Sequence, residues 1–107
     1  MTRYGQVLGM PPENLEEYRR LHAAVWPEVL QTIAACHMHN YTIFYHDGLL
    51  LAYFEYDGDD LEADMAKMAA DPKTQEWWAI NEPLQRRLPT AAPGHWWSEA
   101  VEVFHVE

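Results

Sequence analysis

The sequence predicts an α+β domain of the ferredoxin-like type, in which helices cover one face of an antiparallel sheet. Strand-like and helix-like segments follow one another in the order β-α-β-β-α-β along the 107 residues, which is the pattern of that fold. A helical periodicity of apolar residues occupies the first α position. An Asp-Gly pair between the second and third strand-like segments is a strong hairpin signal. We expect one domain spanning residues 1–107, because the chain is short and has no internal repeat.

The first strand and helix are predicted from the N-terminal third of the chain. Residues 4–10 alternate loosely and precede Pro11-Pro12, which cannot continue a strand without interruption. Asn14, with a glutamate three residues later, fits an N-cap and its capping partner. Apolar residues then recur at steps of three or four, which predicts one amphipathic helix of about 20 residues. Pro27 falls inside it and is expected to bend it.

A β-hairpin is predicted next, from residues 40–45 and 49–56 joined by a turn at Asp47-Gly48. The second of these strands is apolar at both odd and even positions, which indicates that both of its faces are covered. Helices would cover one face. The chain offers no evident cover for the other, so we expect a second copy to pack there, giving a homodimer of the dimeric α/β-barrel type.

The remaining elements are predicted from caps and alternation. Asp59 or Asp60 can cap a second helix, and Asp71 followed by Pro72 starts a further helical segment. Prolines then interrupt a long connection. Residues 100–106 alternate enough to form the closing strand.

Charge and composition exclude several classes of partner. Lys and Arg number 7 against 17 Asp and Glu, and the net charge of −10 opposes binding to nucleic acid or anionic lipid. The longest apolar runs are too short to cross a membrane and the N-terminus lacks a secretory h-region, so we expect a cytoplasmic protein. The single Cys36 cannot form an internal disulfide and is expected to be a small buried hydrophobe.

Candidate chemistry begins on the first predicted helix. Tyr18 and His22 are four residues apart and therefore neighbours on a helix, with Trp26 one turn further on. Histidine, with an unperturbed pKa of about 6.5, can take up and release a proton near neutral pH, so this face could serve acid/base catalysis. The alternative is that His22 is a hydrogen-bonded core residue.

These residues belong to a longer pattern that resembles the L-rhamnose mutarotase family over most of the chain. The pattern comprises Tyr18, His22, Trp26-Pro27-Glu28, Asn40-Tyr41 and Trp77-Trp78. The resemblance implies interconversion of the α and β anomers of L-rhamnose or a related 6-deoxyhexose, a reaction that needs no cofactor and no metal. It implies that His22 transfers the proton, while Tyr18 hydrogen-bonds the sugar or supports the imidazole.

Three more residues are predicted to bind the substrate. Trp77 and Trp78 point about 100° apart on a helix, so at most one is expected to face the core while the other faces a cleft. A flat indole suits the apolar face of a monosaccharide ring, although both residues could instead close the core. Tyr41 and Asn40 point to opposite faces of a strand, and the family pattern favours Tyr41 as the residue that reaches the pocket.

Other patterns are weaker. His37 and His39 would lie on one side of an extended segment, but the remaining histidines form no zinc motif, so we predict no metal site. Trp96-Trp97 is interpreted as packing in the core or at a dimer interface. The connection over residues 88–97 departs from the Asn-Pro-Asp-rich loop associated with the family, which leaves the preferred sugar open.

The same residues also fit two other functions. Dimeric α/β barrels also include small oxygenases that place His, Asn and Trp around haem or an aromatic substrate. A non-catalytic sugar-binding module could use His22 only to hydrogen-bond its ligand.

Overall fold

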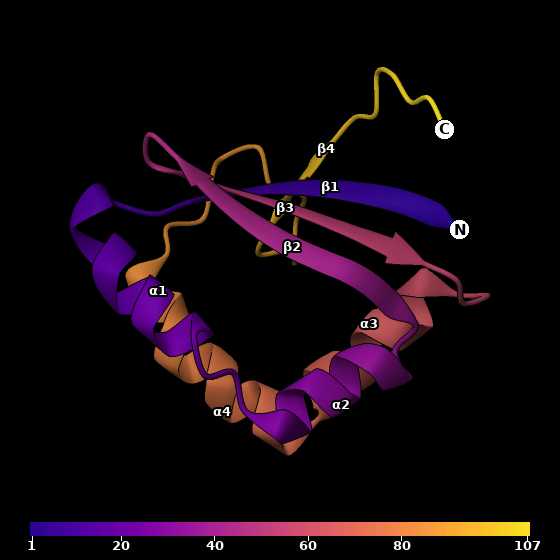
Figure 1. Ribbon diagram of the computed structural model, residues 1–107, viewed down its shortest axis with the longest axis horizontal. Coiled ribbons are helices and arrows are strands. Elements are labelled where there is room, and N and C mark those ends of the chain that lie inside the picture. The colour runs from indigo at the N-terminus through magenta and orange to yellow at the C-terminus, as the bar shows by residue number, and fades with distance from the viewer.

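The computed structural model describes residues 1–107 and contains a four-stranded antiparallel sheet with helices on one face (Figure 1). The strands are β1 (Thr2–Gly9), β2 (Met38–His46), β3 (Leu49–Tyr56) and β4 (Ser98–Ala100). They lie side by side in the order β2-β3-β1-β4. The predicted α+β, ferredoxin-like architecture is therefore confirmed.

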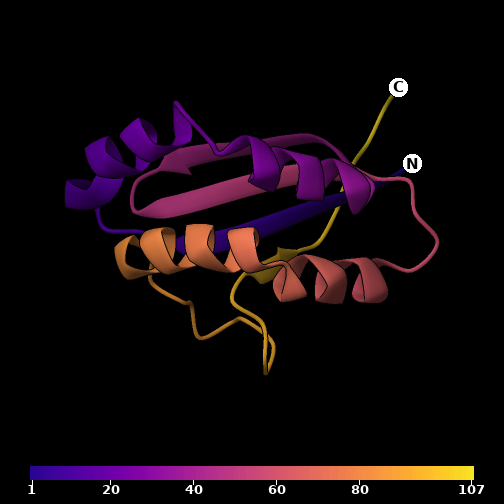
Figure 2. The ribbon, with the colours of Figure 1, turned by 90° about the horizontal axis from the view of Figure 1, so that it is seen from below.

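Four helices cover the inner face of this sheet in two rows. The helices are α1 (Leu15–His22), α2 (Pro27–Ala35), α3 (Leu61–Ala70) and α4 (Pro72–Asn81). In Figure 2, α1 is followed by α2 in one row, and α4 by α3 in the other. The helices of each row meet at an angle, so together they form a V beneath the sheet in Figure 1. At eight to ten residues each, none could traverse a bilayer.

The prediction of one bent helix of about 20 residues was wrong, because two separate helices occupy this region. Trp26 is extended, with φ −61° and ψ 135°, and Pro27 takes the first position of α2. A residue that precedes proline is disfavoured in the helical conformation, whereas proline is well suited to open a helix. The first helix therefore ends at His22, and a second helix begins at Pro27 after a short turn. His22 is the last residue of α1.

The predicted caps were correct for the later helices and wrong for the first. The side chain of Asp60 accepts from the backbone of Ala63 at the start of α3, and Asp71 caps α4. Asn14 makes no capping bond. Its side-chain Nδ2 instead donates to the carbonyl of Leu84 at 2.9 Å, and so ties the start of α1 to the segment that follows α4.

The hairpin turn is formed as predicted. Asp47 and Gly48 both have positive φ, at 48° and 85°, which is the backbone of the type I′ turn that favours Asp-Gly. The turn sets a register in which Tyr45 lies opposite Leu50 and Ile43 opposite Ala52. Alternate residues therefore face the helices.

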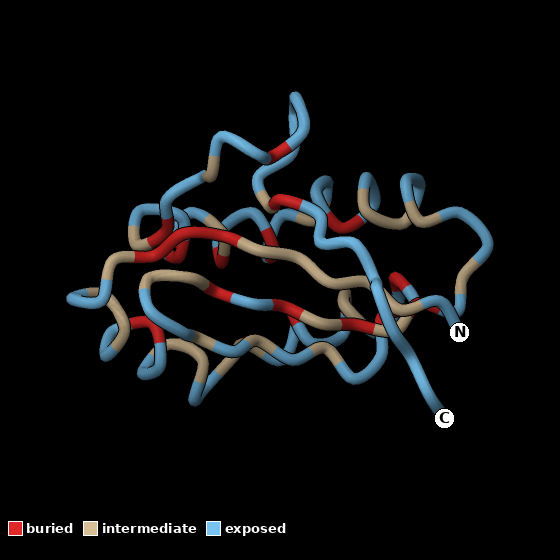
Figure 3. The backbone as a smooth tube through the Cα atoms, turned by 90° about the horizontal axis from the view of Figure 1, so that it is seen from above, coloured by how far each residue is buried: buried red, intermediate tan, exposed pale blue.

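The core lies between the inner sheet face and the helices, in two clusters. One contains Cys36, Met38, Phe54, Tyr56 and Met68; the other contains Leu8, Met10, Tyr18 and Leu50. Figure 3 shows these buried stretches along the two central strands and the helices below them. The predicted burial of Cys36 is confirmed, since none of its surface is exposed.

The predicted closing strand over residues 100–106 was placed too late in the sequence. The observed β4 pairs with Gly5–Val7 of β1 and ends at Ala100, after which residues 101–107 form no regular element. This segment leaves the sheet in Figure 1 and is exposed throughout in Figure 3. Its apolar side chains have nothing to pack against within one chain, which explains why the alternating pattern does not produce a longer strand here.

Candidate active site

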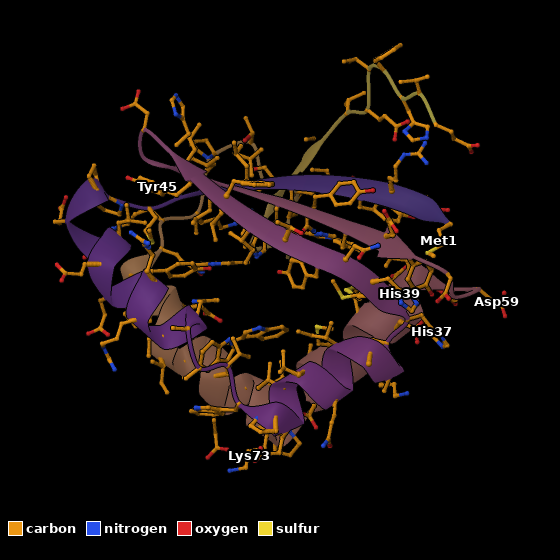
Figure 4. All side chains as sticks on the ribbon, viewed as in Figure 1. Met1, His37, His39, Tyr45, Asp59 and Lys73 are labelled. Atoms are coloured by element: carbon orange, nitrogen blue, oxygen red, sulfur yellow. The ribbon has the colours of Figure 1, made fainter.

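A cavity of about 1490 Å³ lies between the sheet and the helices and is lined mostly by hydrophobic side chains. Figure 4 shows side chains from both layers pointing into this space. Its volume exceeds the roughly 300 to 1,000 Å³ typical of small-molecule sites, so a monosaccharide fits with room to spare. All five residues predicted to form a site line it: Tyr18, His22, Tyr41, Trp77 and Trp78.

His22 occupies the last position of α1 and is half-buried. Its Nδ1 atom lies 2.9 Å from the backbone carbonyl oxygen of Tyr18. A carbonyl oxygen can only accept a hydrogen bond, so Nδ1 carries the proton and Nε2 keeps the free lone pair. Burial lowers the pKa of His22 below its ordinary 6.5, although the bond to Tyr18 partly opposes this. A neutral imidazole with an available base nitrogen therefore lines the cavity.

Aromatic rings hold this imidazole from two sides. The ring of Tyr18 stacks on that of His22, with centroids 4.1 Å apart and planes 27° apart. The indole of Trp77 meets His22 edge to face at 5.3 Å. Trp77 in turn contacts Trp26 at 5.3 Å, so the loop between α1 and α2 packs against α4 beside the histidine.

The hydroxyl of Tyr18 is bonded to Gln85, which in turn bonds Trp96, and neither residue was predicted to belong to the site. Gln85 Nε2 lies 3.3 Å from the phenol oxygen, and Gln85 Oε1 accepts from Trp96 Nε1 at 2.8 Å. Burial raises the pKa of Tyr18, with the bond from Gln85 opposing this, so the phenol keeps its proton at neutral pH. Gln85 lies in an irregular segment with no periodicity or motif, and nothing in its local sequence marks it.

Tyr41 approaches the cavity from the sheet, beside the register shift of β2 between His39 and Thr42. Its ring packs edge to face against Phe54, with centroids 6.0 Å apart. Burial raises its pKa well above the ordinary value, so this phenol also remains protonated. Asn40 points away and donates to Glu55 at 2.8 Å, which confirms that only one of the pair reaches the cavity.

The expectation that at most one of Trp77 and Trp78 faces the core while the other faces a cleft was wrong. Trp77 is 6% exposed, Trp78 packs against the cluster that contains Phe54, and both line the cavity. The cavity lies within the hydrophobic core, so a residue that faces the core can also line the cavity. Two side chains that point about 100° apart on α4 can therefore both border it.

The two histidines considered for a metal lie elsewhere. His37 and His39 contact Asp57 at 3.5 and 3.0 Å, and hydrogen bonding to His39 lowers the pKa of Asp57. Neither histidine lines the cavity, and Figure 4 places both near one end of the molecule, at the start of β2. Of the second tryptophan pair, Trp97 packs against the Tyr18 cluster, while Trp96 bonds Gln85.

Sequence comparisons identify relatives along almost the whole chain. The sequence profile of the L-rhamnose mutarotase family matches residues 3–106. An L-rhamnose mutarotase from Opitutus terrae is 33% identical over 109 aligned positions, covering 100% of both chains. An L-fucose mutarotase from Xanthomonas campestris is 34% identical over 94 positions, covering 84% of this chain and 74% of its own.

A solved structure shares the fold. The crystal structure of an L-rhamnose mutarotase from Formosa agariphila matches over 100% of both chains, with a TM-score of 0.79 and 21% sequence identity. At this identity, the similarity concerns the arrangement of helices and strands.

Proposed function

The chain belongs to the L-rhamnose mutarotase family and is a sugar isomerase, and on that premise we propose that His22 transfers the proton that opens and recloses a monosaccharide ring in the central cavity. The observation that carries the proposal is the bond between His22 Nδ1 and the Tyr18 carbonyl at 2.9 Å. It leaves Nε2 as the base, and burial keeps the imidazole neutral.

Anomer exchange requires one proton to move between two oxygen atoms of the sugar. Nε2 of His22 takes the proton from the anomeric hydroxyl while the bond between C1 and the ring oxygen breaks, and that proton is delivered to the ring oxygen. The product is the open-chain aldehyde. Rotation about the C1–C2 bond presents its other face, and the reverse transfer closes the ring as the opposite anomer. The imidazole returns to its starting state.

Four aromatic residues would bind the sugar around this base. Tyr18 on α1 and Tyr41 on β2 are protonated phenols that donate hydrogen bonds to sugar oxygens from opposite walls. Trp77 and Trp78 on α4 would pack their indoles against the apolar face of the ring. A 6-deoxyhexose adds a methyl group to that apolar surface, so L-rhamnose or a related sugar such as L-fucose suits this largely hydrophobic cavity.

Anomer exchange across a panel of sugars tests the activity. Saturation transfer between the two anomeric proton signals would be measured with and without protein for L-rhamnose, L-fucose and D-galactose, together with binding titrations. We expect acceleration for at least one 6-deoxyhexose. Binding without acceleration of any sugar would identify a binding module instead, and contradict the proposal.

We also propose that the outer face of the sheet binds a second copy of the chain. Phe44 and Leu51 are paired across β2 and β3 on this face and are 61% and 38% exposed. The segment after β4 adds exposed apolar residues: Val101, Val103, Phe104 and Val106. Exposed apolar surface of this kind is typical of a subunit interface. A homodimer would cover it.

A further inference from the structure

A chain of hydrogen bonds connects the C-terminal loop to the proposed active site. Trp96 Nε1 donates to Gln85 Oε1 at 2.8 Å, and Gln85 Nε2 lies 3.3 Å from the hydroxyl oxygen of Tyr18. Gln85 is 7% exposed and Tyr18 5% exposed, so water does not readily replace the bond between these two side chains.

The chemistry of these groups fixes the direction of both bonds. An indole N–H can only donate, so the amide atom that faces Trp96 must be the oxygen. The amide nitrogen therefore faces Tyr18. Because this nitrogen can only donate, the phenol oxygen is the acceptor, and the hydroxyl proton of Tyr18 takes no part in the bond.

The unused proton of Tyr18 is available to the cavity that this residue lines. Accepting a hydrogen bond polarises a hydroxyl and makes it a better donor. The ring of Tyr18 is fixed by its stacking on His22, so the hydroxyl is held beside the base that acts on the sugar.

We propose that Gln85 is a positioning residue for the mutarotase reaction: it holds Tyr18 as a hydrogen-bond donor toward the bound sugar, and Trp96 sets the orientation of Gln85. This inference rests on the proposed function, since it assigns a direction to one of the sugar contacts in the same site. It also gives a role to the loop in which this chain departs from its family's pattern.

Gln85→Glu tests the assignment with almost no change in shape. Both oxygens of the introduced carboxylate can only accept, so one binds Trp96 and the other takes the hydroxyl proton of Tyr18. The phenol then has no proton for the sugar. We expect kcat/KM at pH 8 to fall about five- to tenfold, the loss that corresponds to one hydrogen bond. Gln31→Glu, which adds the same charge on the exposed surface of α2, is the matched control and should leave the rate unchanged.

Acid conditions should reverse the effect. Once protonated, the introduced carboxyl can donate to Tyr18 while its other oxygen still accepts from Trp96. The ratio of variant to wild-type kcat/KM should therefore rise as the pH is lowered from about 8 to about 5, because burial raises the pKa of a carboxyl into that range. A ratio that does not change with pH would indicate a purely structural defect and overturn the proposal.

A double-mutant cycle with Tyr18→Phe tests whether Gln85 acts on the reaction through the Tyr18 hydroxyl. If Gln85 acts through the phenol, Gln85→Glu should cost nothing further once the hydroxyl is absent. An equal loss in the two backgrounds would overturn the proposal. If Gln85→Glu does not fold, Trp96→Phe takes its place in the cycle. Without the indole N–H, the amide of Gln85 can turn its oxygen toward Tyr18. We then expect kcat/KM to fall about two- to fivefold only when the Tyr18 hydroxyl is present.

The proposed function can fail separately from this inference. The His22→Asn variant, measured in the same experiment, tests the proposed function. If this variant folds and still accelerates anomer exchange, the proposed mechanism is wrong as a whole. Loss of exchange in His22→Asn, together with additive losses for Gln85 and Tyr18, would leave the mechanism standing and remove only the role of Gln85.

Discussion

The Nδ1 atom of His22 lies 2.9 Å from the backbone carbonyl oxygen of Tyr18, one turn earlier in α1. This single contact selects the imidazole tautomer whose Nε2 is free, and the stacked ring of Tyr18 holds the imidazole in place. Because α1 ends at His22, its imidazole lies at the break between two helices, next to Trp77 of α4.

The pH dependence of the reaction should reflect the environment of His22. Burial disfavours the imidazolium, so its pKa is lowered from 6.5 and the base form persists into mildly acidic solution. We expect kcat/KM to rise with pH along a limb whose midpoint lies below 6.5. Saturation-transfer rates between about pH 4.5 and 8, corrected for the uncatalysed exchange, measure it. A midpoint at or above the ordinary histidine value would contradict the assignment.

Removing the Tyr41 hydroxyl, on the sheet side of the cavity, should weaken the contact with the sugar without disturbing the fold. Tyr41→Phe keeps the ring that packs on Phe54 and is expected to lower kcat/KM about five- to tenfold by loss of one hydrogen bond to the sugar. Tyr53→Phe makes the same change on the outer face of β3, where the hydroxyl bonds Glu55, and should leave the rate unaltered. Equal rates for the two variants would show that Tyr41 does not bind the sugar.

The helix that carries the tryptophan pair depends on its cap. Asp71 accepts hydrogen bonds from the backbone nitrogen and the hydroxyl of Thr74, both at 2.9 Å, and these bonds lower the pKa of its carboxyl below 3.8. The stabilisation is therefore complete above the unfolded-state pKa and is lost as the pH falls through the lower folded-state value. Asp71→Ala should lower Tm by a few degrees at pH 7 and by less near pH 3.

Thermal unfolding of Asp71→Ala and wild type at both pH values measures this. Asp59→Ala removes an exposed carboxylate that does not cap a helix, and is the matched control. The same loss of Tm at pH 3 as at pH 7 would show that the ionised carboxylate is not what stabilises α4.

A charge on the outer sheet face should dissociate the proposed dimer. Leu51 is exposed in the single chain, so Leu51→Lys should leave the protomer folded while opposing burial of that position against a partner. Light scattering after size exclusion should give twice 12.5 kDa for the wild type and 12.5 kDa for the variant. Ile80→Lys, on the exposed side of α4, should remain dimeric. A wild type of 12.5 kDa would refute the dimer.

Local signals predicted most of the fold. The Asp47-Gly48 turn, the cap at Asp71 and the second hairpin strand over residues 49–56 each depend on neighbouring residues, and each was found where the sequence placed it. The apolar residues at both odd and even positions of that strand predicted cover on both faces, whereas within one chain Leu51 is 38% exposed. The break before Pro27 was missed because apolar spacing continues across it, through Val25 and Val29. Periodicity records which residues are buried, and it cannot distinguish a bent helix from two helices that bury the same face.

Long-range contacts explain what the sequence could not predict. Gln85 reaches Tyr18, and Trp96 reaches Gln85, only because the irregular connection after α4 folds back toward α1. The alternating C-terminal segment was predicted to be a strand because its apolar residues resemble a buried face. Such a pattern does not specify which surface, or which chain, would cover Val101 and Val103.

Substitution of the histidine tests the account most directly. Saturation transfer between the anomeric signals of L-rhamnose would be compared for wild type, His22→Asn and His46→Asn, the last removing an exposed imidazole at the hairpin. With Tm of all three proteins within a few degrees, we expect His46→Asn to match wild type and His22→Asn to show only the exchange seen without protein. A folded His22→Asn that exchanges anomers as fast as wild type would contradict the central claim that this imidazole transfers the proton.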